Sequence, residues 1–204
     1  MNLVSPTDLP TDLHTTRHVL IPGQILLQQG EPAKYLYWVE SGQLRLVSFV
    51  NQRMITHYFV GEGELLAESA LQFDTYACTV IAETSAKVLA IPTEEFAAAL
   101  KQSPALSELY LANLTRRFQS TKDLLELRSI SSARDRILHY LLKRRPAGQT
   151  TVTLDKPLKL LASDLAMTPE GLSRLLSRLQ AEGIITRKKR SISFSEEWLG
   201  DVAE

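Results

Sequence analysis

The chain has 204 residues, of which 44% are hydrophobic and 23% are charged, as expected of a globular protein with one large domain or two small ones. No apolar run approaches the roughly 20 residues that a membrane span needs, the N-terminal segment lacks the basic start and apolar core of a secretory signal, and a single cysteine, Cys78, excludes an internal disulfide and a multi-cysteine metal site. We therefore expect a cytoplasmic protein with no membrane association, no metal and no other cofactor.

The net charge of zero conceals an uneven distribution along the chain. Residues 1–100 carry 5 Lys/Arg against 11 Asp/Glu, residues 101–145 carry 10 against 4, and residues 146–204 carry 8 against 8. Within the last segment, residues 168–190 hold 6 basic residues against 2 acidic ones. This local charge, unlike the total charge, indicates a nucleic-acid partner.

From about Val19 to Ile91 the chain alternates between short β-rich runs and turns. Strands are expected at Ile25–Leu27, Tyr35–Val39 and Leu44–Val50, with breaks at Gly30-Glu31-Pro32 and Ser41-Gly42. The runs "MITHYFV", "CTVIA" and "AKVLAIP" continue at the even spacing of an antiparallel β-barrel or jelly roll. We predict one β-domain over residues 1–100.

After Pro92 the pattern becomes helical. Thr93 begins a predicted helix with two glutamates in its first turn. The segment "SPALSELYLANLTRRFQSTKDLLELRS" then continues for about 25 residues as a second helix. Its modest heptad seam consists of Leu111, Leu114, Phe118, Thr121 and Leu125. The helix could pack only on its own domain, but its length exceeds what the β-domain needs, so we predict a dimerisation helix over residues 101–130 and a homodimer.

The C-terminal part, residues 131–204, has the pattern of a winged helix-turn-helix. Ser132 and Asp135 form a predicted capping box before "RILHYLLKRR". Two short helical patterns, "LKLLASDL" and "MTPEGLSRLLSRLQAEG", follow a polar hairpin-like stretch and are separated by Ala166-Met167-Thr168. The end, "GIITRKKRSISFSEE", is predicted as strand, basic turn and strand. Helix, tight turn, helix and basic wing together indicate DNA binding.

The second of these helices has an apolar stripe of leucines and an opposite face rich in polar groups. In a helix-turn-helix, the N-terminal residues of the second helix meet base edges in the major groove. Arginine can donate to guanine, glutamate can accept from cytosine, and serine can contact a base or a phosphate. We therefore predict Glu170, Ser173 and Arg174 as base readers.

Phosphate contacts are expected around these readers and in the wing. The predicted residues are Thr168, Ser177, Arg178, Arg187, Lys188, Lys189 and Arg190. Taken alone, a basic run is more often a solvated loop. Beside a reading helix, contact with the DNA backbone explains it better.

These motifs, in this order, resemble the cAMP-receptor-protein/FNR (Crp/Fnr) superfamily of bacterial transcription regulators from about Leu20 to Trp198. The residues that carry the resemblance are "GQILLQQGEPAKYLYWVESGQLRL", "GEGELLAESAL", "TVIAETSAKVLAIP" and "LASDLAMTPEGLSRLLSRLQAEGII". The resemblance implies an α+β protein with an N-terminal jelly-roll domain of the cyclic-nucleotide-binding type, a long dimerisation helix and a C-terminal winged helix-turn-helix. It also implies double-stranded DNA and RNA polymerase as partners.

The helix-turn-helix is similar to that of the FNR branch. The Glu-x-x-Ser-Arg pattern at Glu170, Ser173 and Arg174 implies half-sites near TTGAT, whereas the cAMP receptor has an arginine where Pro169 stands and reads TGTGA. One departure is Ala166, which occupies a turn position where the family usually has glycine. A positive φ there would cost about 1 kcal/mol.

The resemblance also implies where an effector would bind. In cyclic-nucleotide-binding relatives, a Gly-Glu-x-Ala-Leu segment and a following Arg-Ser-Ala hold the ribose and the phosphate. Here the corresponding residues are Ala67, Glu68, Ser69 and then Tyr76, Ala77, while Thr121 and Lys122 stand where the cAMP receptor has Thr-Ser facing the adenine. Without the arginine, the phosphate lacks a charge-assisted partner. We predict a degenerate pocket that does not bind cAMP, in which Glu68 lacks a compensating cation.

The identity of any effector stays open. The chain lacks the cysteine cluster of an iron–sulfur sensor. Haem could use His14, His18, His57 or His139, although no spacing singles one out. Cys78 could respond to redox state, but no basic sequence neighbour activates its thiol, and packing as a small core residue fits better. Activity without any ligand is at least as consistent with the sequence.

Enzyme activity is not expected. The chain has no Gly-x-Ser-x-Gly, Walker or His-Glu-x-x-His motif. A ligand-binding module that never contacts DNA is the other rival, but it leaves Ser173, Arg174 and the basic wing unexplained.

Overall fold

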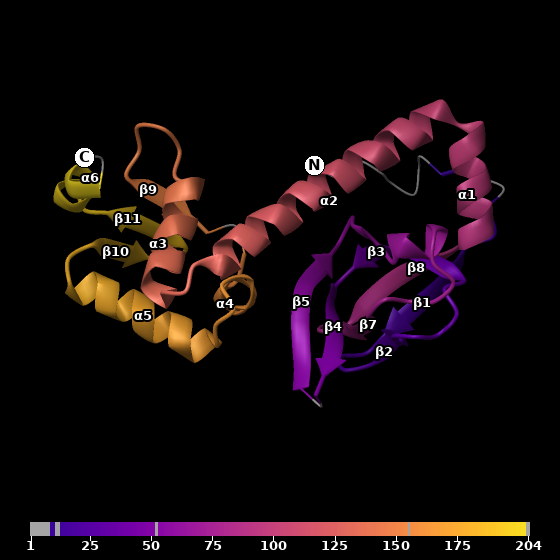
Figure 1. Ribbon diagram of the computed structural model, residues 1–204, viewed down its shortest axis with the longest axis horizontal. Coiled ribbons are helices and arrows are strands. Elements are labelled where there is room, and N and C mark those ends of the chain that lie inside the picture. Colours follow the sequence, from indigo (N-terminus) through magenta and orange to yellow (C-terminus); the bar gives the residue numbers. More distant parts are fainter. Residues whose placement is uncertain (1–8, 11–12, 52, 155, 203–204) are drawn as a thin grey trace. The chain divides into compact units, whose positions relative to one another are not determined.

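The computed structural model describes residues 9–10, 13–51, 53–154 and 156–202, and the chain divides into two compact units between Phe118 and Gln119 (Figure 1). This division lies inside the long helix α2 (Pro104–Ser129), the segment that the sequence analysis treated as a separate dimerisation helix. The mixed fold, with an N-terminal β-domain, a long helix and a C-terminal helix-turn-helix, confirms the predicted class. None of the described helices is long and apolar enough to cross a membrane.

The described residues of the first unit form two antiparallel four-stranded sheets. One has the order β1 (Thr16–Leu20), β8 (Ala86–Pro92), β3 (Tyr35–Ser41) and β6 (Leu65–Leu66). The other has the order β2 (Ile25–Leu27), β7 (Thr79–Ala82), β4 (Gln43–Val50) and β5 (Arg53–Gly61). The predicted strands are therefore confirmed, and their side chains form the core of a jelly roll.

The side chains of strand β3 are buried on both faces of its sheet. Leu36, Tyr37, Trp38 and Val39 are all buried, although successive side chains of a strand point to opposite faces. Tyr37 and Val39 belong to the core shared by the two sheets. Leu36 and Trp38 pack with Phe96 of α1 (Thr93–Gln102) and with the start of α2. A continuous apolar run therefore marks a strand that is covered on both sides.

The second unit is a helical domain with a three-stranded sheet. Its helices are α3 (Ala133–Arg144), α4 (Leu158–Asp164), α5 (Pro169–Ala181) and α6 (Glu196–Val202). The sheet has the order β10 (Ile185–Lys188), β11 (Ser191–Phe194) and β9 (Thr151–Thr153). As predicted, the Ser132 hydroxyl caps α3 by accepting from the Asp135 N–H at 3.2 Å.

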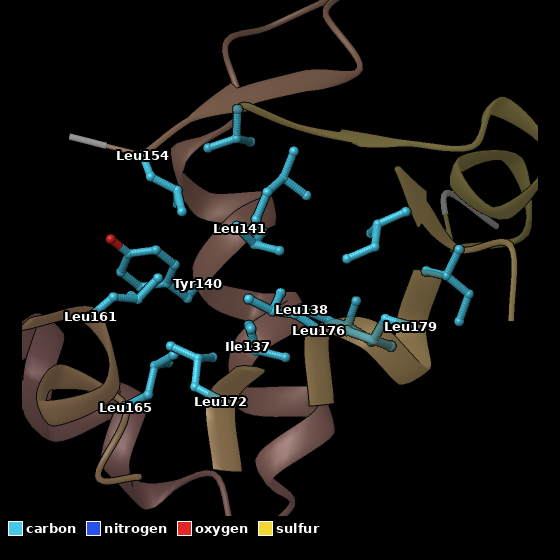
Figure 2. Packing of buried hydrophobic residues seen from close by; sticks show 14 of the residues in the cluster. Ile137, Leu138, Tyr140, Leu141, Leu154, Leu161, Leu165, Leu172, Leu176 and Leu179 are labelled. Atoms are coloured by element: carbon cyan, nitrogen blue, oxygen red, sulfur yellow. The ribbon is translucent and has the colours of Figure 1, made fainter. Parts of the chain in front are cut away.

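The leucine stripe of α5 anchors this unit. Figure 2 shows Leu172, Leu176 and Leu179 directed toward α3, where Ile137 and Leu138 lie. These five side chains are buried. Helix α5 is thus fixed by its apolar face, which leaves its polar face free to meet a partner.

Helix α6 was missed. The segment after Phe194 was predicted to continue as strand, but α6 begins at Glu196. The Ser195 hydroxyl accepts from the Trp198 N–H at 3.3 Å, and the Trp198 ring stacks on Phe194 with centroids 5.2 Å apart. A serine cap followed by two glutamates in the first turn is the signal that could have predicted this helix.

Candidate functional site

The start of α5 is defined by its cap and by the turn before it. Thr168 adopts an extended conformation, and its hydroxyl accepts from the Gly171 N–H at 3.0 Å, while Pro169 occupies the first turn. Ala166 has a φ of 50°, so the turn does need the left-handed conformation that glycine adopts most readily. The cap and the turn fix where α5 begins, and therefore which side chains its first turns present.

The polar face of α5 is open to solvent. The exposed residues are Glu170, Ser173, Arg174, Ser177 and Arg178, which comprise the three predicted base readers and two predicted phosphate contacts. A helix with one face in the core and an exposed face of hydroxyl, acidic and guanidinium groups has the form and chemistry needed to enter a major groove.

The predicted wing is the hairpin of β10 and β11. Lys188 pairs with Ser191, and the turn between them holds Lys189 and Arg190. Lys188, Lys189 and Arg190 are exposed, whereas Arg187 within β10 is half-buried. Lys189 has a φ of 56°, so a lysine occupies a turn conformation that glycine or asparagine would adopt more easily. The hairpin therefore presents ammonium and guanidinium groups at its tip.

Two arginines that the sequence analysis did not single out hold the helix-turn-helix in place. Arg128 of α2 donates to the backbone carbonyl of Ser163 at 3.1 Å and to that of Asp164 at 3.3 Å. Arg136 of α3 donates to the carbonyls of Leu165, at 2.5 Å, and of Ile130, at 2.8 Å. The bonds to Ser163, Asp164 and Leu165 satisfy carbonyls at the end of α4, directly before the turn into α5, and the bond to Ile130 satisfies one between α2 and α3. Part of the basic excess in residues 101–145 is thus used inside the protein.

The first unit contains a cavity of about 170 Å³ at the predicted effector pocket. It is lined by Leu27, Leu46, Tyr58, Ala67, Glu68, Ser69, Tyr76, Ala77, Cys78 and Val80. The structure therefore brings together the predicted pocket residues from both sequence segments. Thr121 and Lys122, predicted for the same pocket, are exposed on α2 in the second unit.

The prediction that Glu68 lacks a cation is wrong. Arg117 of α2 donates to Glu68 with Nη1 at 2.8 Å from Oε1, and its other terminal nitrogen lies 3.8 Å from Glu64. The Arg117 guanidinium also lies 5.5 Å from the centroid of the Tyr58 ring. Side-chain exposure is only 13% for Glu68 and 19% for Arg117. The prediction considered only the residues of the pocket segments, whereas the cation is 49 residues further along the chain than Glu68.

Tyr76 stands where cyclic-nucleotide-binding relatives have an arginine, and its hydroxyl is hydrogen-bonded to the backbone of Tyr35. Its hydroxyl donates to the carbonyl of Tyr35 at 3.0 Å and accepts from the Tyr35 N–H at 3.2 Å. It therefore has no proton left to donate to a phosphate without breaking a bond in the core.

Burial raises the pKa values of Glu68 and Cys78, two of the groups on the cavity wall. It raises the pKa of Glu68 above its ordinary value, and the positive charge of Arg117 opposes that rise. Burial also raises the pKa of the Cys78 thiol, and the nearby Glu68 carboxylate adds to this shift. A thiol that is harder to ionise is a poor nucleophile, so these surroundings do not favour a reactive redox switch at Cys78.

The predicted heptad seam of α2 divides into two sets of residues. Leu111, Phe118 and Leu125 are 64%, 67% and 72% exposed. Thr121 is also exposed, whereas Leu114 packs against the core of the first unit. Three large apolar side chains, seven residues apart on one helix, therefore form a stripe that is open to solvent in the single chain.

The four histidines lie in different surroundings. His14 interacts with Glu95, His57 with the hydroxyl of Ser48 at 2.8 Å, and His139 with a carboxylate of α2 at 3.2 Å. His18 is exposed on β1. Within the described part of the chain, none of these histidines lines the cavity.

Comparison with known families matches each unit separately. A family model described as a cyclic nucleotide-binding domain matches residues 17–103, and one described as a Crp-like helix-turn-helix domain matches residues 135–196. Both matches fall where the structure places the cavity and the exposed face of α5.

Similarity to individual proteins extends over nearly the whole chain. The "Probable transcriptional regulator flp" of Lacticaseibacillus casei is 34% identical, over 94% of this chain and 88% of that protein. The cyclic AMP receptor protein of Thermus thermophilus is 28% identical, over 89% and 85%. The crystal structure of a CRP-family transcriptional regulator from Thermus thermophilus superimposes with a TM-score of 0.57 at 25% identity, covering 87% of this chain and 91% of that one.

Proposed function

The chain belongs to the Crp/Fnr superfamily of bacterial transcription regulators, and from this premise we propose that it is a cytoplasmic homodimer that binds an inverted-repeat operator and acts on RNA polymerase. The observation that carries the proposal is the exposed face of α5, on which Glu170, Ser173 and Arg174 stand together in the first two turns. The homologous proteins are regulators and not enzymes.

In the proposed complex, α5 enters the major groove with its N-terminal end toward the bases. Arg174 would donate two bonds to a guanine, and Glu170 would accept from a cytosine amino group. Ser173 would contact a base or the adjacent phosphate. Half-sites near TTGAT fit this set of donors and acceptors. The wing residues Lys188 and Lys189 would contact phosphates and fix orientation.

The exposed stripe on α2 supports the homodimer. Leu111, Phe118 and Leu125 repeat at the heptad spacing by which two helices pack together. Pairing two copies through this stripe would remove three large apolar side chains from water. A symmetric dimer in turn requires a symmetric operator, whose half-sites lie one helical turn, roughly 34–36 Å, apart.

The cavity supports a regulator that is not controlled by cAMP. A buried cyclic phosphate needs a fixed cation or several donors. The Tyr76 hydroxyl is bonded to backbone, and Arg117 already holds Glu68. Binding of cyclic AMP is a property named for the Thermus thermophilus relative, and we do not extend it to this chain.

The decisive experiment combines footprinting with the mass of the free protein. We expect a dimer by light scattering at micromolar concentration and a protected inverted repeat upstream of a target gene. A monomer that gives no footprint on such repeats would contradict the proposal. Calorimetric titration with cAMP and cGMP tests the effector separately, because micromolar binding that also raises DNA affinity would overturn the conclusion about the cavity.

A further inference from the structure

The cavity of the first unit is mainly apolar but has one carboxylate in its wall. Leu27, Leu46 and Val80 come from the sheet that contains β2, β4 and β7, and Glu68 comes from the short 3-10 helix η2 (Glu68–Leu71). Among the described residues that line the cavity, none is basic. A ligand therefore meets a mainly apolar wall that includes Tyr58, Ser69 and Cys78, and a single charged oxygen acceptor.

The charges behind that wall also favour a cation. Arg117 is shared between Glu68 and Glu64, so these three side chains together carry one net negative charge when ionised. An anion entering the cavity would approach Glu68 and compete with both carboxylates for Arg117. A cation would bring the group to neutrality. At the reduced dielectric of a partly buried site this difference in sign matters more than it does in water.

The acceptor capacity of Glu68 allows a ligand to bind without removing Arg117. A carboxylate has about four lone-pair positions, and Arg117 takes one of them on Oε1. The Arg117 bond can therefore persist while a donor from the cavity side uses another position. The volume of the cavity, about 170 Å³, is sufficient for a ligand with a single ring. For comparison, an engineered apolar cavity of about 150 Å³ binds benzene.

We propose that this cavity binds a small apolar molecule that carries an amine, with the ring or alkyl body against Leu27, Leu46 and Val80 and the amine donating to Glu68. The inference deepens the proposed function by naming the ligand class of its sensor domain, and it rests on that function only for its regulatory meaning. Arg117, which shares Glu68 with the ligand, directly precedes Phe118 of the exposed stripe on α2. The ligand and helix α2 would thus share Glu68 as a partner.

The test uses three probes with the same ring and different head groups, namely benzylamine, benzyl alcohol and benzoate. Calorimetric titration of the full chain at pH 7 should give benzylamine the highest affinity and at least a tenfold advantage over benzoate. Glu68→Gln should reduce this ratio to within about threefold. Glu64→Gln is the matched control, because it removes the same charge from the Arg117 cluster but lies outside the cavity wall, and it should lower the ratio by less than Glu68→Gln does.

The single cysteine supplies a second readout that does not involve DNA. Cys78 lines the cavity, so benzylamine should slow its reaction with an aromatic disulfide reagent, and benzoate at the same concentration should not. Benzoate binding as tightly as benzylamine would overturn the proposal, as would the absence of binding by all three probes up to millimolar concentration. If Glu68→Gln does not fold, the order of the three probe affinities in the unmodified chain tests the proposal by itself. DNA binding is measured in parallel, so its failure would count against the proposed function and not against the cavity.

Discussion

The candidate sites of the two units use charged side chains in opposite ways. In the first, Glu68 and Arg117 are largely buried and satisfy each other at the edge of a cavity. In the second, Arg174 and Arg178 extend from a well-packed helix into solvent. In a buried ion pair the two groups already bond each other, so a ligand must either add a bond to the pair or break it. An exposed guanidinium can donate its hydrogen bonds to a partner molecule. Charge count alone could not distinguish these roles.

A third use of charge lies between these extremes. Arg128 and Arg136 are half-buried and donate to carbonyls at the end of α4 and at the α2–α3 junction. They neither line the cavity nor lie on the exposed face of α5. Their bonds hold the turn that precedes α5, so they position this helix from inside the protein.

The largest expected effect is on the free energy of unfolding and comes from the buried leucines of α5. Their packing fixes the orientation of the helix and so keeps its polar face exposed. Leu176→Ala should lower the free energy of unfolding by about 2–5 kcal/mol, because it removes a fully buried side chain and leaves a cavity. Urea unfolding measures this loss. Ser177→Ala, one residue further on the exposed face, is the control and should stay within about 0.5 kcal/mol of the unmodified chain. Equal losses in both variants would mean that α5 is not anchored as described.

The next effect tests whether an exposed arginine reads sequence. Arg174→Ala should weaken binding to the cognate operator by about 1–3 kcal/mol and relax preference at one base pair, since a bidentate contact to guanine is lost. Competition binding with singly substituted operators measures both changes. Arg178→Ala, at a predicted phosphate contact, should instead weaken cognate and random DNA together. The same pattern for Arg174→Ala would remove it from the base readers.

A smaller change is expected from the wing. Replacing Lys188 and Lys189 by glutamine should reduce the slope of log K against log salt by roughly 2, because each phosphate contact releases about 0.9 of a counterion. Affinity for random DNA should fall in parallel with affinity for the operator. An unchanged slope would show that the tip of the β10–β11 hairpin does not contact the backbone.

The smallest effect concerns the turn before α5. Ala166→Gly should stabilise the second unit by about 1 kcal/mol, because alanine at φ 50° carries a left-handed strain that glycine avoids. Ala181→Gly, at the right-handed end of α5, is the matched control and should be destabilising by up to about 1 kcal/mol. Thermal unfolding of both variants distinguishes a strained turn from a general response to glycine.

Local signals were enough to predict most of the second unit. The Thr168 cap, the first-turn Pro169 and the leucine spacing of α5 all act within a few residues, so the sequence contains them directly. Helix α6 was missed because its cap follows a strand without a break. The left-handed Ala166 was recognised only through the resemblance, since nothing in an alanine itself indicates a positive φ.

Contacts between distant segments could not be predicted in the same way. The Glu68–Arg117 pair joins η2 to α2, and no periodicity identifies which of the adjacent Arg116 and Arg117 meets that carboxylate. Leu114 has the spacing of the seam, yet it packs on the jelly roll because the first unit needs part of α2 to cover its sheet. Spacing predicts a helix face, and packing decides what that face meets.

The apolar stripe on α2 and the polar face of α5 are separate surfaces, and this has a genetic consequence. A chain that keeps Leu111, Phe118 and Leu125 but loses Arg174 would still pair with an intact chain in the proposed dimer. At equal expression, random pairing leaves only about one quarter of the dimers with two intact reading helices. Loss-of-contact alleles in α5 should therefore be dominant over the wild-type gene, whereas alleles that also remove the stripe should be recessive.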